Sequence, residues 1–422
     1  MYESSSRFEA IPSDILSGIF SIALPGLAEF RKRHLAISNL RLVCQQWNTL
    51  ITCTPNFWAS FIILIPSSSI PLPTVRIWLE RSNNASIDVS IQDTLPVIWT
   101  RDEIRSRDEL LATFQPHLWR CKSLSLEASL GFNPGLRKLQ LADAHRLESF
   151  TINMRGNTDE QLHKAILMDI SRLPSLRHLS WTDTAMPFMQ WLLYQSEPSF
   201  LGRLSSIVIA CPITTRELLT LIKSSTSAER IVSSWRARGG EPGSPIVSPS
   251  DPVVLPNLRR LEITLSAHAY RSLIYNTSLV NLAILKISGP SMSDLAKTVG
   301  AWAPSLKCLR TTVWTPRDVF DEMMAFLHHP DILRISILEI ESRESDRWSE
   351  YGGWNELDDE QRLRPAAEEF NTIHSGVRKM IYDKQLGVFG RFFVGWIDPR
   401  LFGAERTPPF PFGDDFVASL LV

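Results

Sequence analysis

The chain of 422 residues is longer than one compact domain usually is, so two or three units or one elongated array of repeats are expected. Its 44 basic and 45 acidic residues leave a net charge of -1, which argues against nucleic acid and against an anionic membrane surface as partners. The five cysteines are odd in number and never closer than nine residues, so neither a disulfide framework nor a CxxC metal site is indicated. This cysteine usage predicts a reducing location, the cytosol or the nucleus.

No targeting or membrane-spanning segment is predicted. Residues 1–10 lack the apolar core of a signal peptide and are expected to be disordered. The apolar run at residues 57–65 is far shorter than the roughly 20 residues that a helix needs to span a bilayer. The sequence therefore predicts a soluble protein.

Two amphipathic helices are predicted near the N-terminus, in residues 11–24 and 40–51. In the first, apolar residues follow an i, i+1, i+4, i+5 spacing after the start signal Pro12 and Ser13. In the second, they recur at i, i+3, i+4 and i+7 from Leu40, and Pro55 is the stop signal. A unit this small rarely sustains its own core, so its apolar faces need a cover. Spacing alone favours a neighbour in the same chain over a partner.

The order of residues in IPSDILSGIF at 11–20, LRLVCQQWNTLI at 40–51 and TPNFW at 54–58 resembles the F-box motif. The chain departs from the motif in the longer and more charged connection at 24–38, so the sequence does not assign the middle helix of the motif. The resemblance implies that residues 11–65 dock on a Skp-family adaptor, and through it on a cullin and a ubiquitin-charged enzyme. Helices that offer apolar side chains to a groove are a usual mode of such recognition. The matching positions are Pro12, Asp14, Ile15, Leu16, Ile19, Phe20, Val43, Cys44 and Trp47.

Two interpretations of the role of Cys44 are open, a reactive thiol and a packing residue. A thiol can act as a nucleophile, but this one lies on the apolar face of the predicted helix, and no histidine is nearer in the sequence than His34. We interpret it as a small packing residue.

Internal repeats dominate residues 74–340. Segments at 134–139, 174–179, 256–261 and 304–309 each read as proline, then leucine, two mostly polar residues and leucine, and weaker copies lie between them. Several intervals, 29, 28, 24, 24 and 29 residues, match the spacing of leucine-rich repeats. The body therefore resembles an irregular leucine-rich-repeat α/β solenoid with a parallel sheet. It lacks the asparagine that usually ends the strand motif of such repeats. The central residues of the expected strands are Leu124, Leu139, Phe150, Leu179, Ile207, Leu261, Leu285, Leu309 and Leu338.

The remaining body is assigned from the same patterns. A helix and then a strand are expected in residues 74–91, and further helices in 159–173, 187–195, 215–222, 292–302 and 316–327. Residues 224–255 are rich in Ser, Pro and Gly and are expected to form a mobile insert, in which Ser244 and Ser248 precede prolines. Those serines could be phosphorylated or belong to an unmodified linker.

Residues 341–422 are expected to form a C-terminal cap, with a helix at 365–386. Four aromatic residues would cover the last repeat: Phe389, Phe392, Phe393 and Trp396.

A target would contact the outer face of the sheet, where the residue between two inward apolar residues points. Those positions are Ser125, Gln140, Thr151, Ser180, Val208, Glu262, Lys286, Arg310 and Glu339. We prefer the charged cluster of Glu262, Lys286, Arg310 and Glu339 as the contact site for a target protein. Solvent-facing strand positions are polar in any case, which is the alternative reading.

No motif of a hydrolase, a phosphate-binding loop, a dinucleotide-binding fold or a helical zinc site is present. His328 and His329 are adjacent, so they do not form the i, i+4 pair of a helical metal site. The predicted function is a non-catalytic receptor subunit of a Skp–cullin–F-box ubiquitin ligase, without cofactor or metal, which holds an unidentified target protein. One alternative is a leucine-rich-repeat scaffold unconnected to ubiquitin transfer, and another is an enzyme with a site among the C-terminal aromatic residues.

Overall fold

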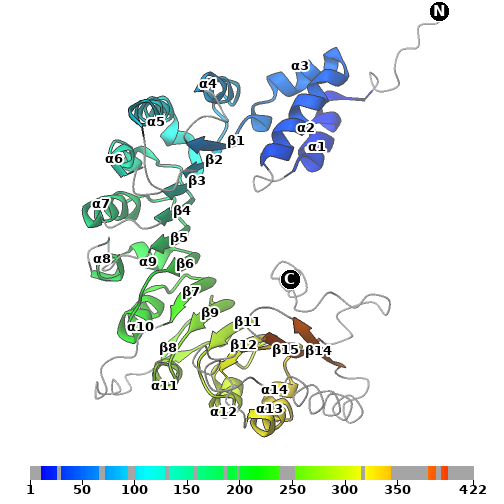
Figure 1. The fold of residues 1–422 in the computed structure, drawn as a ribbon, viewed down its shortest axis with the longest axis vertical. Helices are drawn as coiled ribbons and strands as arrows, with labels where there is room; N and C mark the ends of the chain where they lie inside the picture. The colour runs from blue at the N-terminus through cyan, green and yellow to red at the C-terminus, as the bar shows by residue number, and fades with distance from the viewer. Residues whose placement is uncertain are drawn as a thin grey trace, which may run out of the picture. The chain divides into compact units, whose positions relative to one another are not determined.

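The computed structural model describes residues 11–25, 30–65, 72–93, 100–128, 133–154, 159–183, 188–194, 196, 199–236, 252–314, 319–343, 379–385 and 391–397 (Figure 1). The chain divides into two compact units, residues 1–200 and 201–422, and this division falls inside the predicted 74–340 array. Within the described ranges, no helix combines the length and the apolar character needed to cross a membrane. The prediction for residues 1–10 and the two Ser-Pro pairs lie outside the described residues.

The first unit begins with three helices, α1 (Ser13–Ala23), α2 (Phe30–Val43) and α3 (Gln45–Cys53), and a 3-10 turn, η2 (Pro55–Phe57). The predicted single helix at 40–51 is wrong, because α2 ends at Val43 and Cys44 is extended, with φ -159° and ψ 167°, before α3 starts. The spacing of apolar residues indicates which side chains are buried, but it does not show whether the backbone between them is continuous. Two consecutive helices can therefore give the same spacing as one long helix. Within the connection at 24–38, where the helix of the motif was left open, residues 30–38 lie in α2.

The rest of the first unit alternates strands and helices. The strands β1 (Ser60–Ile65), β2 (Ile87–Asp93), β3 (Cys121–Ala128), β4 (Ser149–Met154) and β5 (His178–Asp183) pair in parallel in chain order. The helices are α4 (Leu72–Arg81), α5 (Arg101–Phe114), α6 (Asn133–Leu136), α7 (Glu160–Ser171) and α8 (Phe188–Tyr194), with the 3-10 turns η3 (Gln115–Arg120) and η5 (Leu141–Asp143). Figure 1 shows these helices on one side of the strands. Residues 60–65, placed in the predicted F-box segment, are thus part of this sheet.

The second unit continues the alternation. The strands β6 (Ser206–Ala210), β7 (Arg230–Arg236), β9 (Arg260–Thr264), β11 (Ile284–Ser288), β12 (Cys308–Trp314) and β13 (Ile337–Arg343) are parallel, and β15 (Arg391–Ile397) and β14 (Lys379–Gln385) follow antiparallel. The helices are α9 (Phe200–Arg203), which starts at the unit boundary, α10 (Thr215–Ser224), α11 (Ala267–Asn276), α12 (Met292–Trp302), α13 (Val319–Leu327) and α14 (Pro330–Leu333). Two short strands, β8 (Val253–Val254) and β10 (Thr277–Ser278), form a separate parallel pair.

The prediction of an α/β fold with N-terminal helices followed by parallel strand–helix repeats is confirmed. The inward residues of the strands alternate with outward ones, and the predicted central residues Leu261, Leu285, Leu309 and Leu338 are all fully buried. The row is in register, since Leu285 pairs with both Leu261 and Leu309, and Leu309 pairs with Leu338. These residues form the core between sheet and helices in the second unit.

The strand predicted around Leu139 is wrong. Leu139 follows α6 and a turn and is buried, but neither it nor Gln140 lies in a strand. The reason is spacing, because only ten residues lie between Leu139 and Phe150, and a parallel crossover needs a dozen or more. Gln140 is therefore not an outer-face position of the sheet.

The structure also corrects two segments near the predicted insert and cap. Residues 230–236, placed in a mobile insert, form β7, because Ile231 and Ser233 alternate inward in the sequence RIVSSWR. Residues 379–385, placed in a helix, form β14, because pairing with β15 overrides local helix preference. The side chains of Phe392, Phe393 and Trp396 on β15, and Phe389, lie outside the described side chains, so the aromatic cap stays a prediction.

Candidate functional site

The interior of the three N-terminal helices is built on aromatic residues. Phe20 of α1, 3% exposed, packs edge-on against Trp47 of α3 with ring centroids 4.7 Å apart, and lies 6.4 Å from the ring of Phe57. Leu16, one turn earlier on α1, is 2% exposed, and Ile51 of α3 is 1% exposed. One side of α1 is therefore the core of this small helical segment.

A neighbouring face of α1, about 100° round the helix from Leu16, is also apolar and faces outward. Ile15, Ile19 and Ile22 are 52%, 50% and 89% exposed, and their i, i+4, i+7 spacing aligns them in one stripe. Pro12, exposed one turn earlier, extends the stripe toward the start of the helix. The other exposed positions of α1 include Asp14, Gly18 and Ser21, so the apolar stripe is a distinct exposed patch of the kind that is suited to a partner.

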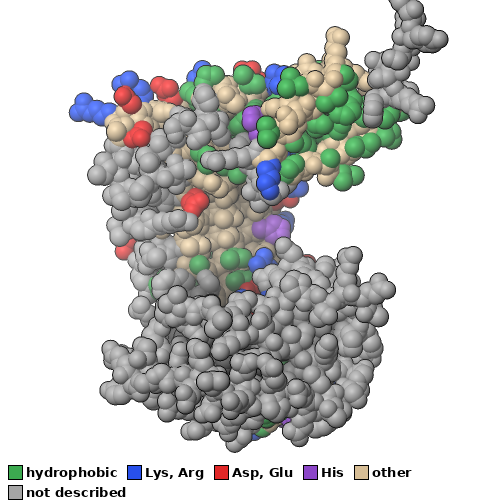
Figure 2. All heavy atoms as spheres, turned by 45° about the vertical axis from the view of Figure 1, so that its right-hand side comes forward, with side chains coloured by type: hydrophobic (Ala, Val, Ile, Leu, Met, Phe, Trp, Pro, Cys, Tyr) green, Lys and Arg blue, Asp and Glu red, His purple; other side chains and the backbone are tan. Residues whose placement is uncertain are grey.

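Exposed apolar side chains concentrate in this segment. Of the twelve large hydrophobic residues that are exposed in the described part of the chain, six lie on α1 and α2. Figure 2 shows hydrophobic side chains gathered over these N-terminal helices. We call the six the exposed apolar residues of α1 and α2: Ile15, Ile19, Ile22, Leu35, Leu42 and Val43.

The nine residues predicted from the F-box resemblance fall into two groups. Leu16 and Phe20 are buried, while Cys44, which precedes α3 at its N-cap position, and Trp47 are half-buried; these four shape the interior. The five exposed residues are Pro12, Asp14, Ile15, Ile19 and Val43. Sequence reasoning missed Ile22, Leu35 and Leu42, although the seven-residue interval from Ile15 to Ile22 signals a shared face.

A buried indole joins the helices to the first strand–helix repeat. Trp58, 4% exposed, donates its Nε1–H to the carbonyl of Ile51 in α3 at 2.8 Å. The guanidinium carbons of Arg81, at the end of α4, and Arg41, on α2, lie 4.5 Å and 5.8 Å from the Trp58 ring centroid. Three helices thus meet at one side chain, which fixes how the N-terminal segment sits on α4 within the first unit.

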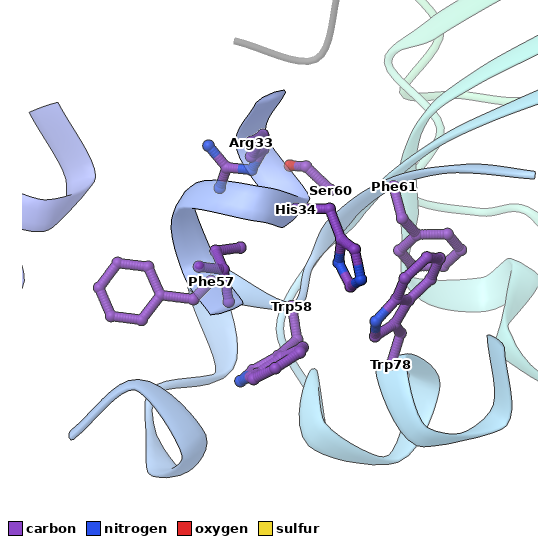
Figure 3. A pocket seen from close by; sticks show the side chains of 8 residues that line it. Arg33, His34, Phe57, Trp58, Ser60, Phe61 and Trp78 are labelled. Atoms are coloured by element: carbon purple, nitrogen blue, oxygen red, sulfur yellow. The ribbon is translucent and has the colours of Figure 1, made fainter. Parts of the chain in front are cut away.

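Beside this joint is a small open hollow with room for about one water molecule. His34 packs edge-on against Trp78, with ring centroids 5.2 Å apart (Figure 3). Arg33, which also lines the hollow, donates from Nη1 to the carbonyl of Pro25 at 3.0 Å. Burial lowers the pKa of both His34 and Arg33. The hollow is smaller than a typical ligand pocket and marks the junction of helix and sheet.

The four residues predicted to meet a target lie side by side on the second unit's sheet. Lys286 pairs in register with Glu262 on one side and Arg310 on the other, and Arg310 pairs with Glu339. Lys286 is exposed, Glu262 and Glu339 are half-buried, and Arg310 is 7% exposed. The row exists as predicted, but only one member faces solvent freely.

No group of histidine, cysteine and carboxylate side chains that could hold a metal occurs among the described residues. Three of the five cysteines, Cys121, Cys211 and Cys308, are buried. Burial raises the pKa of the Cys121 thiol, so it stays protonated and unreactive.

Comparison with known proteins gives little. No protein-family model matches the chain, and no curated protein matches it. Among solved structures, the chain is similar to a chain of the crystal structure of the Rad7 and Elc1 complex in yeast, with a TM-score of 0.43 and 14% identity, covering 75% of this chain and 85% of that chain.

Proposed function

We propose that this chain is a substrate receptor of a Skp–cullin–F-box ubiquitin ligase, at work in the cytosol or the nucleus. The exposed apolar residues of α1 and α2 would bind a Skp-family adaptor and through it a cullin, while the strand–helix repeats hold a target protein. Such a receptor needs no catalytic side chain, because holding the target raises the effective concentration of its lysines near the ubiquitin-charged enzyme.

The observation that supports this proposal most is the stripe of Ile15, Ile19 and Ile22, exposed on a helix whose neighbouring face is already buried. It lies within the segment whose residue order resembles the F-box motif. Burying the exposed part of each isoleucine in an apolar groove would contribute on the order of 1–3 kcal/mol. Together the three side chains would therefore carry a large share of the affinity.

Capture by a purified Skp-family adaptor tests the proposal. The double variant Ile15→Asp, Ile19→Asp places two carboxylates in the stripe without touching the Phe20–Trp47 interior, so we expect capture to fall at least about 100-fold, or about 3 kcal/mol. The thermal midpoint should stay within about 2 °C of the wild-type value, since exposed substitutions change stability little. Ile104→Asp, on α5 and 38% exposed, is the matched control and should bind normally.

Two outcomes would contradict the proposal. A folded wild-type chain that does not bind the adaptor rules it out and favours the repeat scaffold without ubiquitin transfer. Equal capture by wild type and the double variant would show that α1 is not the docking helix. Trp47→Ala, which empties the interior, should lower both the capture and the thermal midpoint, so it is the less specific test.

A further inference from the structure

The outer face of the second unit's sheet carries a row of charged residues at one register. Val232 of β7 pairs with Glu262 of β9, which pairs with Lys286 of β11, and the row continues to Arg310 and Glu339. Adjacent strands lie about 4.8 Å apart, so each charge is within reach of its neighbours. The balance of charge along this row decides what the face can bind.

The carboxylates of the row are neutralised and shielded from solvent. Glu262 accepts from Nε of Arg260, two positions back on the same strand, at 2.6 Å, and these side chains are 12% and 17% exposed. Glu339 lies 3.5 Å from Nε of Arg310, with side chains 14% and 8% exposed. Each acid is thus held against an arginine, and neither offers its negative charge to an incoming partner.

Two cations on the same face are different. Lys286 on β11 and Arg230 on β7 are both exposed, and among the described residues neither has an ionic partner. Arg230 on β7 pairs in register with Arg260 on β9, and Lys286 on β11 pairs with Glu262, two residues after Arg260. Arg230 and Lys286 are therefore two strands and two residues apart, a distance of about 12 Å between their backbones. The accessible charge on β7, β9 and β11 is therefore positive, whereas the half-buried Glu341 lies farther along the face on β13 and accepts from Thr312.

We propose that this face binds an extended acidic segment of a protein, with one carboxylate at Lys286 and another at Arg230. Calling that protein the target of a ligase rests on the proposed function. At about 3.3 Å per residue, two carboxylates about four positions apart in an extended segment reach both cations. Two exposed cations are too few for a nucleic acid, whose affinity depends on many phosphate contacts.

A labelled peptide measures this directly. The probe is a twelve-residue peptide with glutamates at positions 4 and 8 in a Gly/Ser background, and its binding to the full-length chain is followed by fluorescence anisotropy at low salt. Lys286→Glu and Arg230→Glu should each weaken binding by at least about fivefold, because each removes an attraction and adds a repulsion. Added salt should weaken wild-type binding. Lys297→Glu, the same charge change at an exposed position of α12, should leave binding unchanged.

The peptide and adaptor measurements distinguish failure of the acidic-segment site from failure of the proposed function. Equal binding of the glutamate peptide and its glutamine counterpart, no binding of either, or equal weakening by Lys297→Glu would overturn the proposal. Binding of a phosphoserine counterpart without the glutamate peptide would overturn it in favour of a phosphorylated segment. Adaptor capture is measured on the same Lys286→Glu protein and should match wild type. A chain that binds the peptide but not the adaptor would contradict the proposed function and leave the acidic-segment site standing.

Discussion

Replacing Arg120 by methionine should loosen the connection between α4 and β2. Arg120 is 1% exposed, and its guanidinium donates from Nη2 to the carbonyl of Leu79 at 2.9 Å and from Nη1 to the carbonyl of Ala85 at 3.1 Å. Nη1 also donates to Ser82 Oγ at 3.0 Å. The last carbonyls of a helix have no intrahelical donor, so a side chain from η3 here satisfies the end of α4 and the loop after it.

The magnitude follows from these bonds. A buried hydrogen bond from a charged donor contributes about 1.5–3 kcal/mol, and its loss leaves an acceptor without compensation. Leu79 keeps one donor, because the Ser82 hydroxyl also bonds its carbonyl at 3.0 Å. Methionine retains most of the buried stem of Arg120, so the packing loss is small. We expect a destabilisation of about 2–4 kcal/mol in total.

Thermal unfolding followed by circular dichroism checks this value. For a unit of about 200 residues, about 2–4 kcal/mol lowers the midpoint by roughly 4–16 °C. The control is Arg137→Met: the side chain of Arg137 is 58% exposed, and its Nη2 lies 2.6 Å from Oδ2 of Asp159. An exposed ion pair contributes about 0–1 kcal/mol, so this midpoint should move by no more than about 4 °C. Equal shifts in the two variants, or an unchanged midpoint in Arg120→Met, would refute the reasoning.

Two further measurements test backbone and charge. Gly289 has φ +109°, and a Cβ there would collide with the carbonyl of Leu265, so Gly289→Ala should cost more than about 1–2 kcal/mol in chemical denaturation. Gly18→Ala, with nothing within 4 Å, should stabilise α1 by about 0.5–1 kcal/mol, and the reverse order would contradict this account. Burial lowers the pKa of His34 and His117, so their contribution to stability is complete above about pH 6.5 and is lost as the pH falls below it. The thermal midpoint should therefore drop between pH 7.5 and 5.5, less in the His34→Gln, His117→Gln double variant, and a midpoint that rises would disprove the sign.

The repeats were predictable because their information is local. A strand with one side against helices must alternate apolar and polar residues, and Leu261, Leu285 and Leu309 carry that alternation in the sequence itself. The same locality explains the errors. The segment around Leu139 has the residue pattern of the repeat, but too few residues follow it for a crossover to the next parallel strand. In β7 the apolar alternation lies within a stretch whose Ser, Pro and Gly content predicted a loop.

The boundary at Cys44 shows a second limit. An i, i+3, i+4 pattern continues through residues 40–51, but the backbone is extended at Cys44 and the chain starts a new helix there. Across the break, Nε of Arg41 donates to Oδ1 of Asn48 at 3.0 Å, a contact between α2 and α3 that no periodicity encodes. Helix ends of this kind depend on contacts between elements, and pattern reading locates them poorly.

For the candidate site, residue order alone was enough to predict a short apolar helical segment that resembles a docking motif and a row of charges on the sheet. The orientation of α1 came from the tertiary structure. Two neighbouring faces of that helix are apolar, so the packing of Phe20 against Trp47 decides that Leu16 turns inward and Ile15 outward. In the charged row, likewise, the ion pair of Arg310 with Glu339 forms between separate strands, and it leaves Lys286 as the exposed member because pairing and burial arise only when the strands lie together.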